Sequence, residues 1–175
     1  AKEHFPKAIE NEDEVLMDLL FFNLTNLESI DLSDSYLKES PEFLTKFIDA
    51  INDNRLANLK NINLANNFLC GSEEGKRFLT ELVTAINDNK TPNLQVINLD
   101  SNMLSCAEEF LPLLIGAINN NKIINLEVIS LAGNFLGANE IGRGALEQLV
   151  SAINESKLPN IKEINLESNC LSGTK

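Results

Sequence analysis

The sequence predicts an α/β fold: a right-handed solenoid with parallel strands on its concave face and helices on its convex face. Three observations predict it. The pattern L-x-x-I-x-L-x-x-N-x-L occurs five times, with small variations. An amphipathic helical pattern follows each of the first four copies in a constant register. The copies begin 32 or 35 residues apart, a period typical of repeat arrays.

The repeated motif predicts a short strand followed by a turn. The copies span residues 27–37, 59–69, 94–104, 126–136 and 161–171. Ile and Leu two residues apart predict a strand with one buried face. The Asn near the end of four copies is expected to bond backbone groups that the turn leaves unpaired, and to do so from unit to unit. Ser35 replaces it in the first copy, so we expect a less regular first unit.

The helical half of each unit has apolar residues at i, i+1, i+4, i+5, i+7 and i+8, which predicts one broad buried stripe. Three Asn residues just after the helices are expected to be left-handed C-terminal caps: Asn54, Asn89 and Asn121. A basic residue follows each helix end, at Arg55, Lys90, Lys122 and Lys157. These basic residues either complement the helix dipole, which we favour, or form a stripe for an acidic partner.

The alternation of 32- and 35-residue intervals places three additional residues in every second unit. They fall within residues 70–77 and 137–144, between strand and helix. Both segments contain Gly and charged residues, as an exposed loop or an added first helical turn would. This long-loop edge is therefore a candidate contact surface.

The ends of the chain differ from the repeats. Residues 1–26 are expected to form an N-terminal tail and a capping helix at 12–22, and residues 27–175 to form five units. The last unit is incomplete, because only residues 172–175 follow its strand motif. We therefore expect the chain to be part of a longer protein.

Charge and composition limit the classes of partner and the compartment that we expect. A net charge of −12 disfavours nucleic acid and favours basic or polar proteins. No apolar run reaches the roughly 18 residues of a membrane span. The three cysteines, Cys70, Cys106 and Cys170, contain no C-x-x-C pair, which is typical of a cytosolic-type reducing compartment. Cys70 and Cys106 are expected to be neighbours, with free thiols favoured over a disulfide.

The sequence contains few candidate catalytic residues. The single histidine, His4, cannot form a triad or a metal site by itself, and no phosphate-binding Gly-rich motif occurs. Acidic pairs such as Glu73-Glu74 suit helix N-termini better than acid–base catalysis. We therefore expect no enzyme activity, no cofactor, no metal and no small-molecule substrate.

The five copies resemble leucine-rich repeats of the helix-containing, ribonuclease-inhibitor-like type, over residues 27–171. The units exceed the usual 20–29 residues, which implies longer helices or ascending loops. The alternating unit lengths, Asn-rich helix ends and low aromatic content are similar to leucine-rich repeat effectors of intracellular bacteria, a resemblance that implies secretion into a host cytosol. Some helix-containing relatives activate small GTPases, and the candidate arginines for that role are Arg77 and Arg143.

The expected binding surface is the concave strand face. Strands stack about 4.8 Å apart and helices about 10 Å apart, so the array must curve with the strands inside. The candidate protein-binding residues lie between the buried Ile and Leu positions: Asp31, Asn63, Val96, Asn98, Asp100, Val128, Ser130, Asn165 and Glu167. We therefore expect a non-enzymatic platform that binds a protein through this face or through the long-loop edge. A GTPase-activating or other regulatory role is the alternative.

Overall fold

The computed structural model describes Phe22 and residues 25–171 of the 175-residue chain. Apart from Phe22, the capping helix expected at 12–22 lies outside the described residues, as does His4. Within the described ranges, no helix combines the length and the apolar character needed to cross a membrane.

Five short strands form one parallel sheet in chain order: β1 (Ser29–Asp31), β2 (Asn61–Asn63), β3 (Val96–Asn98), β4 (Val128–Ser130) and β5 (Glu163–Asn165). Equivalent motif positions pair directly, so that Ile62 lies between Ile30 and Ile97 in the ladder. The expected strands and their parallel arrangement are therefore confirmed.

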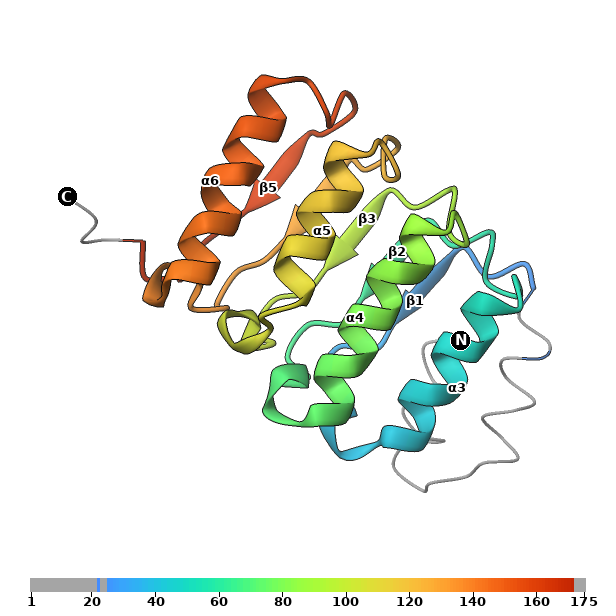
Figure 1. Cartoon of the computed structure of the whole chain (residues 1–175). Helices are drawn as coiled ribbons and strands as arrows, with labels where there is room; N and C mark the ends of the chain where they lie inside the picture. The colour runs from blue at the N-terminus through green and yellow to red at the C-terminus, as the bar shows by residue number, and fades with distance from the viewer. Residues whose placement is uncertain (1–21, 23–24, 172–175) are drawn as a thin grey trace.

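An α-helix follows each of the first four strands: α3 (Pro41–Asn52), α4 (Glu73–Asn87), α5 (Phe110–Asn119) and α6 (Glu140–Asn154). Figure 1 shows these helices side by side, in chain order, over the same face of the sheet. Short 3-10 turns precede the helices, at Leu37–Glu39, Leu69–Gly71, Leu104–Cys106 and Leu136–Ala138. The described part of the chain places no helix over the other sheet face.

The hydrophobic core lies between the sheet and the helices. The alternating Ile and Leu residues of the first four motifs are all buried, as are the small Ala50, Ala85, Ala117 and Ala152 of the helices. The Phe47 ring stacks on Phe78 of the next helix, with centroids 5.7 Å apart. In the fifth motif Ile164 and Leu166 are only partly buried, since no described unit follows them.

The Asn side chains of the turns form a buried ladder along the array: Asn67, Asn102, Asn134 and Asn169. Asn102 shows the pattern. Its Oδ1 accepts the Leu69 N–H at 3.2 Å, and its Nδ2 donates to the carbonyl oxygens of Leu64 at 2.8 Å and Asp100 at 3.1 Å. Its own N–H donates to Oδ1 of Asn134 in the next unit. The expected bonding from unit to unit is confirmed.

The turn of the first unit is as regular as the others. Asp34 and Tyr36, which flank Ser35, have φ of 55° and 51°, like their counterparts in later units. The N–H groups of Ser35 and Leu37 both donate to Oδ1 of Asn67. The expected irregularity is therefore absent at this turn, because the next unit supplies the acceptor that these N–H groups need.

The helices end in a repeated left-handed cap. Asn54, Asn89 and Asn121 have φ between 56° and 60°, as predicted, and Ser156 has the same conformation after α6. The basic residue that follows donates its N–H to the carbonyl of the buried helix Ala, 2.9 Å away in all four units. This bond closes the last turn of each helix.

The three additional residues of the longer units form a first helical turn, one of the two expected arrangements. Helices α4 and α6 each have 15 residues, against 12 in α3 and 10 in α5. Ser72 and Asn139 cap them by accepting the N–H of Gly75 and Gly142, respectively. A Cβ at either glycine would overlap the carbonyl oxygen of the preceding 3-10 turn. Glycine therefore lets the added turn pack against the strand–helix connection.

Candidate functional site

The candidate site is the face of the sheet opposite the helices. Of the nine candidate residues, seven are partly buried and lie along it in adjacent columns: Asp31, Asn63, Val96, Asn98, Asp100, Val128 and Asn165. Glu167 is exposed. Strand pairing places Val96 beside Val128 and Asn63 beside Asn98. The structure thus brings these residues together on one surface.

Ser130 differs from the other candidates because it is buried, with 8% of its surface exposed. Its hydroxyl donates to Oδ1 of Asp100 at 2.6 Å, and the same oxygen accepts the N–H of Ala132 at 2.7 Å. The neighbouring carboxylate therefore holds Ser130 within the structure. Strand pairing places Ser130 beside Asn98 on this face, and its contact with a partner stays a prediction.

The last residues of the five strands form the central column of this face: Asp31, Asn63, Asn98, Ser130 and Asn165. Asn63, Asn98 and Asn165 each accept, through Oδ1, the N–H of the residue two positions later, at 2.9–3.1 Å. Asp31 does the same for Ser33. Such local bonds satisfy backbone donors where the chain leaves the sheet. Among the described residues, Nδ2 of Asn98 and of Asn165 makes no hydrogen bond, so these two donors are available to a bound molecule.

A shallow depression of about 450 Å³ lies at the ends of the strands on this face. Three carboxylates line it, those of Asp34, Asp100 and Glu167, together with turn residues such as Asn66 and Gly133. No Lys or Arg is among its lining residues. The depression therefore favours positively charged groups.

A column of mostly large apolar side chains, which was not predicted, accompanies the buried Asn ladder. Each member follows the turn position of the buried Asn: Tyr36, Phe68, Met103, Phe135 and Cys170. Tyr36, Phe68 and Phe135 are 66%, 43% and 47% exposed. The signal was the apolar residue between Asn and Leu in the repeated motif. We call these five residues the apolar column.

A second, exposed Asn ladder was also missed. Each member donates from Nδ2 to a backbone carbonyl of the preceding unit, at 2.8–3.1 Å: Asn58 to Thr25, Asn93 to Ala57, Asn125 to Pro92 and Asn160 to Ile124. The signal was present, because Asn stands directly before the first apolar residue of every motif. The sheet is thus bonded across units at both ends of its strands.

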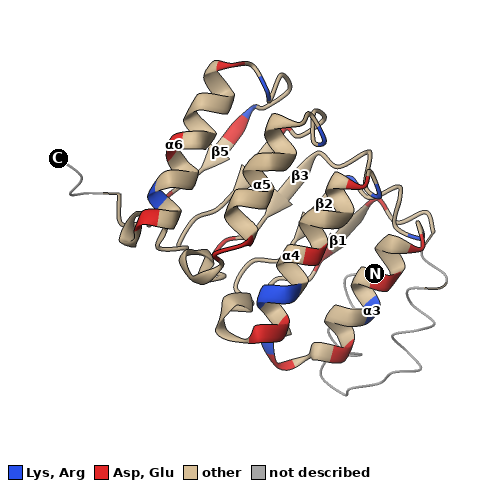
Figure 2. Ribbon diagram, in the orientation of Figure 1, with Lys and Arg blue, Asp and Glu red and all other residues tan. Residues whose placement is uncertain are grey.

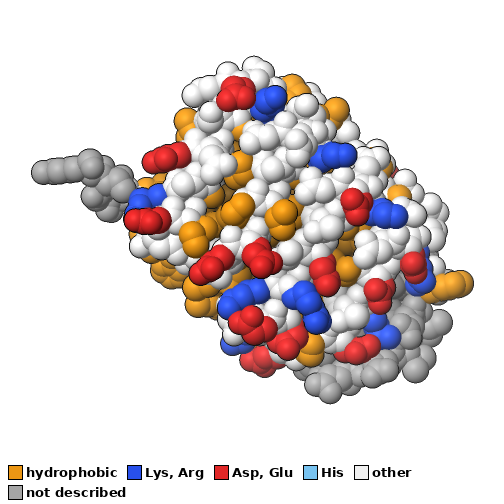
Figure 3. Space-filling view, viewed as in Figure 1, with side chains coloured by type: hydrophobic (Ala, Val, Ile, Leu, Met, Phe, Trp, Pro, Cys, Tyr) orange, Lys and Arg blue, Asp and Glu red, His pale blue; other side chains and the backbone are white. Residues whose placement is uncertain are grey.

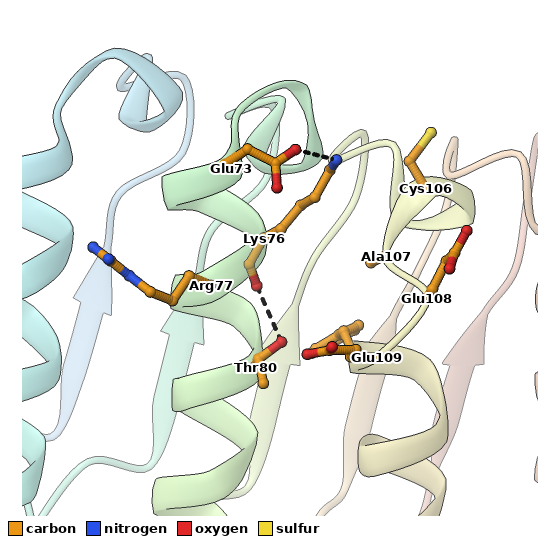
Figure 4. A pocket seen from close by; sticks show the side chains of 9 residues that line it. Glu73, Lys76, Arg77, Thr80, Cys106, Ala107, Glu108 and Glu109 are labelled. Atoms are coloured by element: carbon orange, nitrogen blue, oxygen red, sulfur yellow. Dashed lines mark hydrogen bonds and ion pairs between the residues drawn. The ribbon is translucent and has the colours of Figure 1, made fainter.

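The helix face carries a groove of about 480 Å³ between α4 and the turn before α5. Figure 4 shows Lys76 directed toward Glu73, and its Nζ donates to Oε1 of Glu73 at 2.7 Å. That hydrogen bond, with the charge of Glu73, raises the pKa of Lys76. Arg77 points away toward the neighbouring helix, with its Nε 3.9 Å from Oε1 of Glu81. The groove lining mixes both signs of charge, because Glu73, Glu108 and Glu109 share it with Lys76 and Arg77.

The other arginine considered for GTPase activation has a structural contact. Nη1 of Arg143 donates to the carbonyl oxygen of Gly137 at 2.8 Å, which ties the first turns of α6 to the 3-10 turn before it. Across residues 25–171 and Phe22, no group of three His, Cys, Asp or Glu side chains is placed to hold a metal ion. Acidic and basic side chains are interspersed over the helix face (Figures 2 and 3).

All three cysteines are free thiols. Cys70 is buried, and burial, followed by the charge of Cys106, raises the pKa of its thiol to about 12. Cys106 and Cys170 are exposed. The preference for free thiols over a disulfide between Cys70 and Cys106 agrees with this arrangement.

Comparisons of the chain with protein-family models, curated proteins and solved structures give no significant match.

Proposed function

We propose that this chain is a leucine-rich repeat solenoid of the ribonuclease-inhibitor-like type, right-handed, that acts as a non-enzymatic platform for a protein partner. The partner binds the concave face of the sheet. The observation that carries the proposal is the one-sided cover of the sheet: helices cover one face, and the other presents partly exposed side chains in register on five adjacent strands.

Rigidity supports this role. The buried Asn ladder and the exposed Asn ladder bond each unit to the next at both ends of the strands. A face held in this way is ordered before the partner arrives, which lowers the entropic cost of binding. The small polar side chains of the central column leave room for a partner to approach the sheet.

The structure also bears on the choice between the sheet face and the long-loop edge. The additional residues of the longer units are a turn of helix, held by capping bonds and by buried glycines. They do not form an extended loop that could wrap a partner. The sheet face is therefore the preferred binding surface.

The test is the capture of partners from a lysate by the wild-type chain and by single variants. Val96→Arg and Val128→Arg each place a long cation on the sheet face, and they should remove the specific partner from the bound set. Gln148→Arg, on an exposed position of α6, is the matched control and should retain it. Retention of the partner by both valine variants, with the fold intact by circular dichroism, would exclude the sheet face.

We also propose that the protein acts in a reducing compartment. Two exposed cysteines and one buried cysteine are unpaired, which supports a reducing environment.

A further inference from the structure

We infer that the partner presents an extended segment in which basic and apolar side chains alternate, bound over the acidic depression and the apolar column. This inference rests on the proposed platform function and names the chemistry of the partner. Two independent features carry it: exposed apolar side chains in a costly backbone conformation, and a neighbouring depression with negative charge alone.

The apolar column is held in left-handed backbone conformation. Tyr36, Phe68, Met103, Phe135 and Cys170 have φ between 51° and 60°. This region is uncommon for residues with a Cβ, and bulky side chains are disfavoured there while Asn and Gly are tolerated. The same chain places Asn54, Asn89 and Asn121 in this conformation at its helix ends. The choice of large apolar residues at the column is therefore not dictated by the backbone.

Exposure of the apolar column to water is a second unfavourable contribution to stability. Large apolar side chains gain their stabilisation by leaving water, and Tyr36, Phe68 and Phe135 remain about half exposed or more. Phe68 has a cation–π contact, with Nζ of Lys38 5.9 Å from the centroid of its ring. Contiguous exposed apolar groups and outlying backbone conformations both mark binding sites. The column therefore indicates a surface that a partner covers.

The depression is lined by residues that directly precede the buried Asn ladder in the sequence. Its lining includes, in every unit, the residue two positions before the column member: Asp34, Asn66, Ser101, Gly133 and Ser168. The column and the depression consequently run in parallel across the units. Three carboxylates and no basic residue in the lining make the depression complementary to Lys or Arg.

An extended segment fits both rows at once. Its successive side chains point to opposite sides, with a rise of about 3.3 Å per residue, and neighbouring strands of the sheet lie about 4.8 Å apart. A segment of roughly six residues thus spans the five units. Apolar residues at alternate positions would reach the column, and basic residues between them would reach the carboxylates.

The test uses three synthetic octapeptides as probes, with titration at 0.15 M salt. One alternates Lys with Leu or Phe, one alternates Lys with Ser, and one alternates Glu with Leu or Phe. The first should bind, and the other two should bind at least about tenfold more weakly. Equal binding of the Lys–Ser peptide would show general attraction to an acidic protein and would overturn the inference.

Variants locate the site. Tyr36→Ser/Phe68→Ser/Phe135→Ser should weaken the Lys–Leu/Phe peptide by about tenfold or more. Asp34→Asn/Glu167→Gln should weaken it several-fold and reduce its salt dependence. The matched controls change exposed groups elsewhere and should leave binding within about twofold: Ile124→Ser/Ile141→Ser/Val150→Ser and Glu74→Gln/Glu147→Gln.

Circular dichroism of each variant is the control for folding. Equal effects of the column variant and its control would overturn the inference. The outcome is separable from the proposed function: loss of the captured partner in Val96→Arg and Val128→Arg, with no peptide binding at the column, would retain the platform and reject this partner chemistry.

Discussion

At the scale of single residues, the position of a polar group decides what it can do. Asn102 is fully buried and bonds backbone groups of its own and the preceding unit. Its loss would leave buried donors and acceptors unpaired, which costs roughly 1–3 kcal/mol for each group. Asn93 makes its bond at the surface, where water can replace it. The buried Asn ladder therefore contributes more to the stability of the fold than the exposed one.

Thr91 shows a polar residue in an apolar position. It stands where the other units have Leu56, Ile123 and Leu158, all of them buried. Its Oγ1 is buried and has no hydrogen-bond partner within the described residues. An unpaired buried hydroxyl lowers the free energy of unfolding.

The three cysteines should separate by reactivity. The thiolate is the nucleophile in thiol–disulfide exchange, and burial raises the pKa of Cys70 to about 12. At pH 8 only about one Cys70 thiol in ten thousand is then ionised. We expect an aromatic disulfide reagent to modify two thiols of the native protein rapidly, at Cys106 and Cys170, and the third only after unfolding. Cys106→Ser should leave one rapid thiol. Three equal rates in the native protein would contradict this assignment.

At the scale of elements, two glycines determine whether a longer unit can form. Gly75→Ala should lower the free energy of unfolding by roughly 2–3 kcal/mol, because its Cβ would overlap the backbone of Leu69 and move α4. Gly116→Ala is the matched control, since no atom lies near its Cβ position inside α5. That change should stabilise the protein by about 0.5–1 kcal/mol. Urea unfolding of the two variants measures both values, and equal stabilities would show that the close approach is not real.

The sequence predicted the regular parts of the elements more fully than their contacts. Period-two and helical apolar spacing identified the strands and the buried stripe, because burial imposes that spacing directly. The choice between a loop and an added turn at 70–77 stayed open, since it depends on packing of Gly75 against Leu69. The low exposure of Ser130 could not be predicted, because it depends on a hydrogen bond to Asp100 of the preceding unit. The apolar residue between Asn and Leu is visible in the repeated motif, but its exposure and left-handed conformation, which define the apolar column, are visible only in three dimensions.

At the scale of the whole molecule, each unit buries its apolar surface against its neighbours. Helix α4 packs between α3 and α5, and its residues Leu79, Val83 and Ile86 are buried. The equivalent residues of α6 are less covered: Leu146 is partly buried, and Val150 and Ile153 are exposed. Stability in such an array is the sum of unit and interface contributions. The C-terminal unit of the described chain therefore lacks one of the two interfaces that stabilise a central unit.

This difference predicts effects of different size for one substitution at equivalent positions. Val83→Ala should lower the free energy of unfolding by about 2 kcal/mol, because it leaves a cavity around a side chain that is 1% exposed. Val150→Ala should change it by less than about 0.5 kcal/mol, since that side chain is 56% exposed. Both changes gain the same helix propensity of Ala over Val, so their difference isolates packing between units. Urea unfolding measures the pair, and amide exchange should be faster in α6 and β5 than in α4 and β3. Equal losses in the two variants would show that α6 is covered in solution, by a second copy or by residues outside the described range.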